Sequence, residues 1–153
     1  MKGNSSRLRK GRFSEIGRIY LVTFVTYKRR AIFTEFDNAR LMVSVLKRES
    51  EYTKTLCFVV MPDHVHWLLQ LGDTSLSKTV QRVKSISSRA IKRKLAHNCS
   101  EAIWQNGFHD HALRKDEDLV KLARYVVMNP VRAGLASKVG KYSHWDAVWV
   151  NGE

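Results

Sequence analysis

Two kinds of hydrophobic pattern alternate along the chain. Four short runs are rich in β-branched and aromatic side chains, which is typical of strands. Two longer runs place apolar side chains three and four positions apart, as on one face of an amphipathic helix. A further helix is predicted where acidic residues 116–118 favour the positive end of the helix dipole, and Asn129 and Pro130 end it. The predicted strands are residues 19–27, 53–61, 64–71 and 108–113, and the two longer runs are about 37–52 and 75–97.

The order of these elements predicts an α+β fold. Residues 19–114 follow the order βαββαβ, the ferredoxin-like arrangement of an antiparallel sheet with both helices packed on one side. Residues 1–18 contain six Lys and Arg residues against the single acid Glu15, so we expect a basic arm before the first strand. Residues 115–153 supply the last helix and a C-terminal tail. We expect a single domain over residues 1–153, because this length suits one hydrophobic core.

The charge of the chain narrows its possible partners. The sequence has 27 Lys and Arg residues against 14 Asp and Glu residues, so its net charge is +13. This excess predicts a polyanionic partner. A membrane fits less well, because the sequence has no apolar stretch of about 18 residues and no apolar segment directly after its basic N-terminus. We expect a cytoplasmic protein, in which Cys57 and Cys99, without a C-x-x-C spacing, are structural thiols.

A pair of histidines interrupts one of the most apolar predicted strands. Residues two positions apart in a strand project from the same face, so His64 and His66 offer two imidazoles to one metal ion. Histidines buried in a strand are more often satisfied by ordinary hydrogen bonds. Their interpretation as metal ligands therefore depends on other residues of the chain.

A tyrosine on the last predicted helix changes that weighting. Tyr125 lies well over 100° from the centre of the apolar stripe, at about 100° per residue, whereas a core tyrosine would lie within the stripe. Asn129 projects from nearly the same side one turn later. Tyr125 is the candidate nucleophile, and the amide oxygen of Asn129 is the candidate third ligand of Mg²⁺ or Mn²⁺. Asn129 has a competing local role, which is to cap or turn the chain before Pro130.

A second H-x-H pattern, His109 with His111, is the alternative metal site. It ranks lower because Asp110 points away from both imidazoles and because this pattern has no tyrosine-bearing helix of its own. One or both histidines can instead line the active cleft as acid, base or phosphate contact. Arg114 could bind a phosphate, although a solvated arginine is the commoner outcome.

Two basic segments are candidates for contact with nucleic-acid phosphates. No acid lies between Ser75 and Ser100, and this one-sided charge argues against an ordinary solvated helix face. Aromatic side chains could stack on bases, although filling the core is the commoner role. The aromatic candidates are Trp67, Trp104 and Phe108. The candidate phosphate contacts are Arg7, Arg9, Lys10 and Arg12 in the arm, and Lys78, Arg82, Arg89 and Arg93 in the predicted helix.

Three motifs follow one another in an order that is specific to one family. They are residues 60–69 (VMPDHVHWLL), 104–114 (WQNGFHDHALR) and 124–134 (RYVVMNPVRAG). On these motifs the chain resembles the REP-associated tyrosine transposases, which are HUH single-strand endonucleases, U being a large apolar residue and here Val65. The resemblance covers nearly the whole chain. It implies a ferredoxin-like fold, a divalent metal such as magnesium or manganese, cleavage of hairpin-bearing repeat DNA as a single strand, and a 5′-phosphotyrosine on Tyr125.

Three functions from different classes remain. We favour a metal-dependent single-strand DNA endonuclease and strand transferase, because a metal-bound His pair, a phenol and a basic chain suit attack on a phosphodiester. The main alternative is a regulator that binds nucleic acid on the same fold without cleaving it. The third is a metal-dependent hydrolase of a smaller anionic substrate. The sequence leaves open whether the protein acts as a monomer or a homodimer.

Overall fold

The computed structural model describes residues 15–49, 53–95 and 101–147. The strands are β1 (Ile19–Val25), β2 (Lys54–Met61), β3 (His64–Gln70), β4 (His109–Ala112) and β5 (Trp145–Ala147). The α-helices are α2 (Phe36–Glu49), α3 (Leu76–Leu95), α4 (Leu119–Val127) and α5 (Asn129–Arg132), and the 3-10 turns are η1 (Tyr27–Arg29), η2 (Ile32–Thr34) and η4 (Val139–Lys141). All five strands form one antiparallel sheet in the order β4-β1-β3-β2-β5.

The predicted α+β core is confirmed. The elements from β1 to β4 follow the order βαββαβ, and β2 and β3 form a hairpin across Pro62 and Asp63. The sequence pattern did not predict β5, which pairs with β2 at the edge of the sheet. Three residues are too few to show the period of a strand, and their pairing depends on residues far away in the sequence, such as Val59 opposite Trp145. The C-terminal segment thus extends the same sheet.

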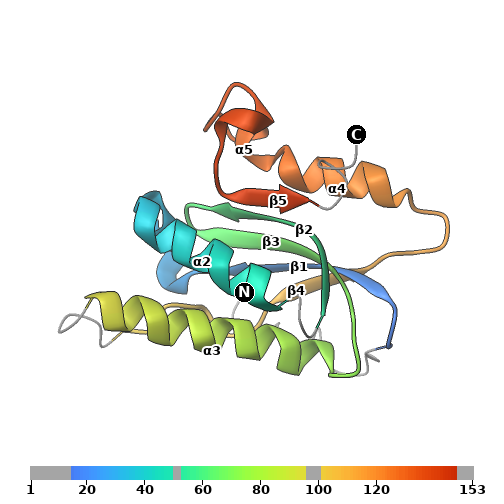
Figure 1. Cartoon of the computed structure of the whole chain (residues 1–153), viewed down its shortest axis with the longest axis horizontal. Coiled ribbons are helices and arrows are strands. Elements are labelled where there is room, and N and C mark those ends of the chain that lie inside the picture. Colours follow the sequence, from blue (N-terminus) through green and yellow to red (C-terminus); the bar gives the residue numbers. More distant parts are fainter. Residues whose placement is uncertain (1–14, 50–52, 96–100, 148–153) are drawn as a thin grey trace.

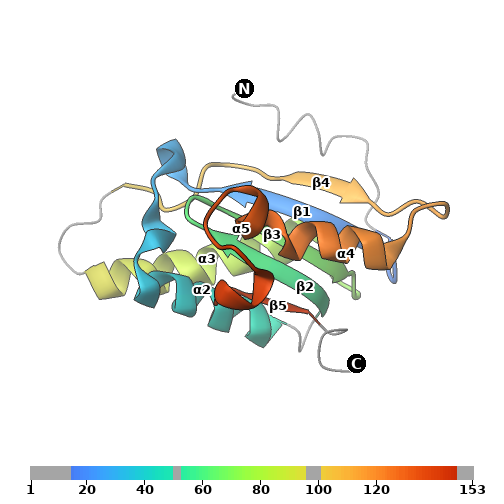
Figure 2. The same cartoon turned by 90° about the horizontal axis from the view of Figure 1, so that it is seen from above.

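The two faces of the sheet are covered by different helices (Figure 1, Figure 2). Helices α2 and α3 lie on one face, where Val22, Phe24, Val65 and Trp67 belong to the main buried cluster. Helix α4 covers the other face, where a second cluster joins Val126 and other α4 residues to side chains of β2 and β3. Strands β1, β2 and β3 supply alternate side chains to the two clusters, as the pleat requires. This alternation decides which face each polar side chain of a strand reaches.

Specific residues determine where α4 begins and ends. Asp118 is the N-cap, and its side chain accepts hydrogen bonds from the backbone N–H groups of Val120 and Lys121. The helix ends before Asn129 and Pro130, as predicted. The chain then enters the short helix α5, which the sequence did not predict. Pro130 is tolerated there because the first turn of a helix has no use for its missing N–H group.

The connection after β1 holds an unusual backbone. Lys28 and Arg29 have φ angles of 57° and 53°, in the left-handed region that residues other than glycine rarely adopt. Such residues cost about 1–3 kcal/mol each and persist where surrounding contacts determine the conformation. Here Arg30 donates to the backbone oxygen of Ala102, and Thr26 donates to that of Asp63. This turn lies at the end of β1 that pairs with His64.

Within the described ranges, no helix is long and apolar enough to cross a membrane. Residues 1–14 of the predicted basic arm, which include Arg7, Arg9, Lys10 and Arg12, lie outside the described residues.

Candidate active site

Two imidazoles project side by side from β3. His64 and His66 share the face of Leu68, which belongs to the cluster beneath α4. Their ring centroids are 4.8 Å apart, with an angle of 87° between the ring planes. The predicted pairing of the two side chains on one face is therefore present, and this face is the one that α4 covers.

Each imidazole is oriented through its Nδ1 atom. His64 Nδ1 lies 2.7 Å from Asp63 Oδ1, and His66 Nδ1 lies 2.9 Å from the hydroxyl oxygen of Thr23 on β1. Asp63 is held in turn by Arg29, whose Nε lies 3.2 Å from the other carboxylate oxygen. With Nδ1 engaged in this way, Nε2 of each ring is the nitrogen left to bind a metal ion. A hydrogen-bonded second nitrogen is the usual environment of a histidine that ligates a metal.

The protonation of His66 also suits a ligand. Burial is the largest cause that lowers the pKa of His66 from 6.5 to about 4, and electrostatic interactions with His64 and Arg132 contribute to the same decrease. The imidazole is therefore neutral at physiological pH. Only the neutral ring has a lone pair to give to a metal ion.

Tyr125 lies on α4 away from its buried stripe. Ala123, Val126 and Val127 pack on the sheet, whereas 57% of the surface of Tyr125 is exposed. The prediction that this tyrosine lies outside the core is confirmed. Its phenol is accessible to a bound substrate.

Arg132 on α5 contacts Tyr125, and it was not among the predicted site residues. Its guanidinium carbon lies 3.8 Å from the centroid of the Tyr125 ring, and its Nη2 donates to the backbone oxygen of Tyr125 at 2.6 Å. The same positive charge acts on His66. Arg132 thus lies against the phenol ring and contributes a positive charge to the surroundings of His66. Its position within the motif of residues 124–134 could have indicated Arg132 as a site residue.

Asn129 has the local capping role that competes with its predicted role as a metal ligand. Its Nδ2 donates to the backbone oxygen of Val126 at 2.9 Å and, at 3.5 Å, to that of Tyr125. These bonds satisfy carbonyl groups at the end of α4. They use only the amide nitrogen, and Oδ1 accepts no hydrogen bond from the part of the chain that the structure describes. Capping through nitrogen and metal binding through oxygen are therefore compatible.

The residues present fit a hard divalent cation with substrate oxygens in its coordination sphere. The described ranges contain no group of three or more His, Cys, Asp and Glu side chains that could hold a metal. A closed zinc-type site of such ligands is thus not formed there. His64 and His66 supply two nitrogens, Asn129 is the available amide oxygen, and further positions are left for water or phosphate, as in magnesium and manganese sites.

The second H-x-H pair projects from the same face but serves another contact. His109 and His66 lie on opposite sides of Thr23 in neighbouring strands, so about two strand spacings, near 10 Å, separate their backbones. His111 Nε2 lies 2.9 Å from Glu117 Oε1. The backbone N–H of Arg114 and then His111 hold the pKa of Glu117 below its usual range. His109 remains an exposed candidate at the margin of the site, whereas His111 is engaged.

The remaining candidates fall into three groups. Arg114 is exposed and forms ion pairs with Asp116 and Glu117. The candidate base-stacking residues Trp67, Trp104 and Phe108 are buried in the main core, so they fill the interior. The candidate phosphate contacts on α3, which are Lys78, Arg82, Arg89 and Arg93, lie on the layer opposite α4 and therefore behind the sheet as seen from the histidine pair (Figure 1). They do not border the site.

The α+β fold, with two histidines on the sheet face that the tyrosine-bearing helix covers, agrees with the arrangement that the resemblance to HUH endonucleases implies. The family model described as "Transposase IS200 like" matches residues 14–129. The chain belongs to this family of IS200-like transposases, which are DNA-cleaving enzymes.

Its relatives include REP-associated tyrosine transposases. One from Escherichia coli strain K12 is 27% identical over 126 residues, which cover 80% of this chain and 71% of that protein. A relative from Haemophilus influenzae Rd is 27% identical over 137 residues, covering 80% of this chain and 76% of its own. The solved structure of a REP-associated tyrosine transposase bound to a REP hairpin covers 88% of this chain and 79% of that chain, with a TM-score of 0.69 and 24% identity. This similarity shows the shared fold.

Proposed function

We propose that this protein is a metal-dependent single-strand DNA endonuclease and strand transferase that acts on hairpin-forming DNA, with Tyr125 as nucleophile. The observation that carries the proposal is the pair of adjacent imidazoles, His64 and His66, on the sheet face that is covered by α4, the helix that exposes Tyr125. Membership of the IS200-like transposases supports a reaction on DNA. A relative of the same fold, solved with a REP hairpin, supports hairpin DNA as the substrate class.

His64 and His66 would hold the metal through their Nε2 atoms, and Asn129 Oδ1 is the third candidate ligand. When bound there, Mg²⁺ or Mn²⁺ would polarise a non-bridging phosphate oxygen and stabilise negative charge during attack. Thr23 and Asp63 keep the two rings oriented with Nδ1 as the hydrogen-bonded atom. Because these contacts already restrict the rings, the rings lose less conformational freedom when a metal ion binds.

The chemistry proposed for Tyr125 is a transesterification. Its phenolic oxygen attacks the phosphorus, a new oxygen–phosphorus bond forms, and the bond from phosphorus to the 3′ oxygen breaks. The phenolic proton is lost to solvent or a nearby base, and the leaving 3′ oxygen gains a proton, so the balance is neutral. The product is a 5′-phosphotyrosine and a free 3′-hydroxyl. A second 3′-hydroxyl can reverse the step on another strand without a nucleotide cofactor.

Denaturing gels of labelled hairpin DNA test the proposal directly. Wild-type protein with Mn²⁺ or Mg²⁺ is expected to form an adduct that survives denaturation, and Tyr125→Phe is expected to form none. Tyr27→Phe is the matched control and should retain the adduct. His64→Ala should lose metal-dependent cleavage while hairpin affinity stays within about tenfold, because phosphate contacts elsewhere supply most of the affinity.

Two other outcomes would replace the proposal. Salt-sensitive hairpin binding by wild-type protein without any adduct would identify a non-cleaving DNA-binding regulator. Turnover of a small phosphate ester that is indifferent to Tyr125→Phe would identify a hydrolase of smaller anionic substrates. Loss of hairpin binding in His64→Ala equal to its loss of cleavage would make that histidine a structural residue.

A further inference from the structure

The two metal-ligand candidates differ in how they are oriented. Thr23 lies directly opposite His66 in the sheet, and its hydroxyl oxygen lies 2.9 Å from His66 Nδ1. His64 lies opposite the apolar residues Val25 and Met61, whose side chains offer no comparable hydrogen-bond partner. The partner that orients the His64 ring must therefore come from outside the strands.

Asp63 in the turn of the β2–β3 hairpin is that partner, and both of its carboxylate oxygens are engaged. Oδ1 lies 2.7 Å from His64 Nδ1, and Oδ2 lies 3.2 Å from Arg29 Nε. A carboxylate that met only the histidine could rotate among the rotamers of its side chain. One that is held from two sides keeps a single orientation, so the contact from Arg29 is transmitted to the His64 ring.

The backbones of the two turns are joined independently of these side chains. The backbone N–H of Thr26 donates to the backbone oxygen of Asp63 at 3.0 Å, and the Thr26 hydroxyl donates to the same oxygen at 3.1 Å. The backbone N–H of Phe33 donates to the backbone oxygen of Pro62 at 3.0 Å. Thr26 is fully buried. The turn after β1 thus keeps its place beside the hairpin without the side chain of Arg29.

Arg29 lies on a backbone that residues with side chains rarely adopt. Both Lys28 and Arg29 have positive φ angles, a conformation that glycine adopts without steric strain. The chain uses glycine at other such positions, namely Gly17, Gly107 and Gly134. At positions 28 and 29 it instead keeps two long cationic side chains. Strained residues of this kind are concentrated at functional sites.

The stability of the fold does not account for this strain. The Arg29 side chain is 58% exposed, and an exposed ion pair usually contributes little to stability. Its neighbour Lys28 pairs with Glu101 and has no contact with Asp63. The two strained residues therefore differ in one respect that matters for the site, because only Arg29 contacts the group that orients His64.

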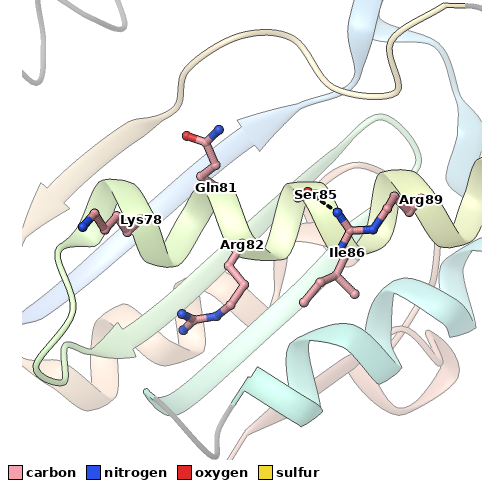
Figure 3. A pocket seen from close by; sticks show the side chains of 6 residues that line it. All are labelled: Lys78, Gln81, Arg82, Ser85, Ile86 and Arg89. Atoms are coloured by element: carbon pink, nitrogen blue, oxygen red, sulfur yellow. Dashed lines mark hydrogen bonds between the residues drawn. The ribbon is translucent and has the colours of Figure 1, made fainter.

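Arg29 also differs in location from the exposed cations of α3. Lys78 and Arg89 line an open groove beside α3 (Figure 3), in the layer on the other face of the sheet from the histidine pair. Arg29 instead follows the end of β1 that pairs with His64. Its charge is thus placed at the active-site end of the sheet.

We propose that Arg29 is a positioning residue of the metal site, which holds the Asp63 carboxylate so that His64 keeps Nε2 available to a metal ion. The strained turn is maintained for this purpose. The inference rests on the proposed function, because it takes His64 as a ligand. Loss of a group that orients a ligating histidine typically weakens metal binding 10- to 100-fold. Arg29 acts through Asp63, so its loss should weaken metal binding without a matching loss of hairpin binding.

A pair of glycine substitutions tests the inference. Arg29→Gly and Lys28→Gly relieve backbone strain at neighbouring positions, but only the first removes the contact with Asp63. Calorimetry without DNA measures Mn²⁺ affinity, and urea unfolding with and without Mn²⁺ measures stability and its increase on metal binding. Arg29→Gly is expected to bind Mn²⁺ about tenfold more weakly, with an unfolding midpoint in metal-free buffer equal to or above that of wild type. Lys28→Gly should keep Mn²⁺ affinity within about twofold.

A double variant separates action through Asp63 from direct contact with DNA. Asp63→Asn keeps the size of the side chain but removes the charge that attracts Arg29, and it should weaken Mn²⁺ binding by about 10- to 100-fold. Adding Arg29→Gly to Asp63→Asn should then weaken Mn²⁺ binding by less than about twofold further, because the two residues act as one unit. Hairpin affinity of Arg29→Gly should stay within about threefold of wild type, since at most one phosphate contact is removed.

Several results would overturn the inference. They are equal Mn²⁺ affinities of Arg29→Gly and Lys28→Gly, additive effects in the double variant, and a metal-free midpoint of Arg29→Gly below that of wild type, which would make Arg29 a structural residue. Absence of Mn²⁺ binding by wild-type protein would also overturn it. Failure of the proposed function is a different result, namely the absence of any Tyr125 adduct in wild-type protein. Adduct formation by wild type together with unchanged Mn²⁺ binding in Arg29→Gly would reject this inference alone.

Discussion

At the scale of single residues, the site depends on side chains that orient other side chains. Thr23 and Asp63 each fix one imidazole, and Asp63 is itself held by Arg29 at a strained turn. Arg132 acts in a similar way on Tyr125, because its guanidinium carbon lies 3.8 Å from the centroid of the Tyr125 ring. The guanidinium has five donors in a planar fork, of which one contacts the backbone of Tyr125. The remaining donors can reach a phosphate that approaches the phenol.

Replacing Arg132 should therefore affect the reaction more than binding. Arg132→Ala is expected to slow adduct formation about 100-fold, as for loss of a donor to developing negative charge, with hairpin affinity changed less than about tenfold. Arg132→Lys should be intermediate, because lysine keeps the charge but cannot form the planar stack. Single-turnover rates at saturating DNA are the measurement. Equal rates for wild type and Arg132→Ala would exclude a role in positioning the tyrosine or the phosphate.

At the scale of elements, α4 carries the nucleophile on a helix that is fixed by its opposite side. Val126 is fully buried in the cluster that α4 forms with β2 and β3, and Cys57 lies beneath the helix. Burial raises the pKa of the Cys57 thiol to about 12, so this thiol is a packing group and not a nucleophile. The helix can expose Tyr125 because its anchoring contacts come from other residues.

Two valines on this helix allow a matched comparison. Val126→Ala is expected to lower the free energy of unfolding by about 2 kcal/mol, through lost burial and the cavity that remains. Val120, with 41% of its surface exposed, is the control, and Val120→Ala should change stability by less than about 0.5 kcal/mol. Urea unfolding followed by circular dichroism measures both. Equal effects of the two substitutions would show that α4 is not anchored through Val126.

At the scale of the whole molecule, the sheet separates two kinds of surface. One face presents the histidines, the tyrosine helix and Arg132, and the other supports α3 with its cations. The net charge of +13 makes DNA binding by the whole protein sensitive to salt, whichever surface is engaged. The partly buried His66 on the active-site face also links the stability of the fold to pH.

The metal-free protein should lose stability as the pH falls from about 6.5 to about 4. The unfolded chain protonates His66 near pH 6.5, whereas the folded protein keeps it neutral down to about pH 4, so the unfolded state binds more protons in this window. The loss is at most about 3.5 kcal/mol from this group, since one pKa unit corresponds to about 1.4 kcal/mol. Urea unfolding at several pH values measures it. His66→Gln should flatten the dependence, and an unchanged profile in that variant would contradict the assignment to His66.

Much of the fold was accessible from local patterns. The periods of apolar residues predict β3, α2 and α3, because each of these elements buries one face over many residues. Tyr125 could be placed outside the core by the same helical period. The three-residue strand β5 and the short helix α5 were not accessible, since their formation depends on pairing with β2 and on packing beyond Pro130. Arg132 was missed for the same reason, because its contact with the tyrosine is set by α5.

The sequence by itself determined that two imidazoles share a strand face, that Tyr125 lies outside the apolar stripe of its helix, and that the chain is strongly basic. These properties depend on residue type and on spacing within one element. Only the tertiary structure decided that α4 covers the histidine face, that Arg132 lies against the Tyr125 ring, and that the α3 cations lie on the opposite side. These relations depend on how separate elements pack, and packing is governed by burial of both faces of a sheet that the local pattern cannot orient.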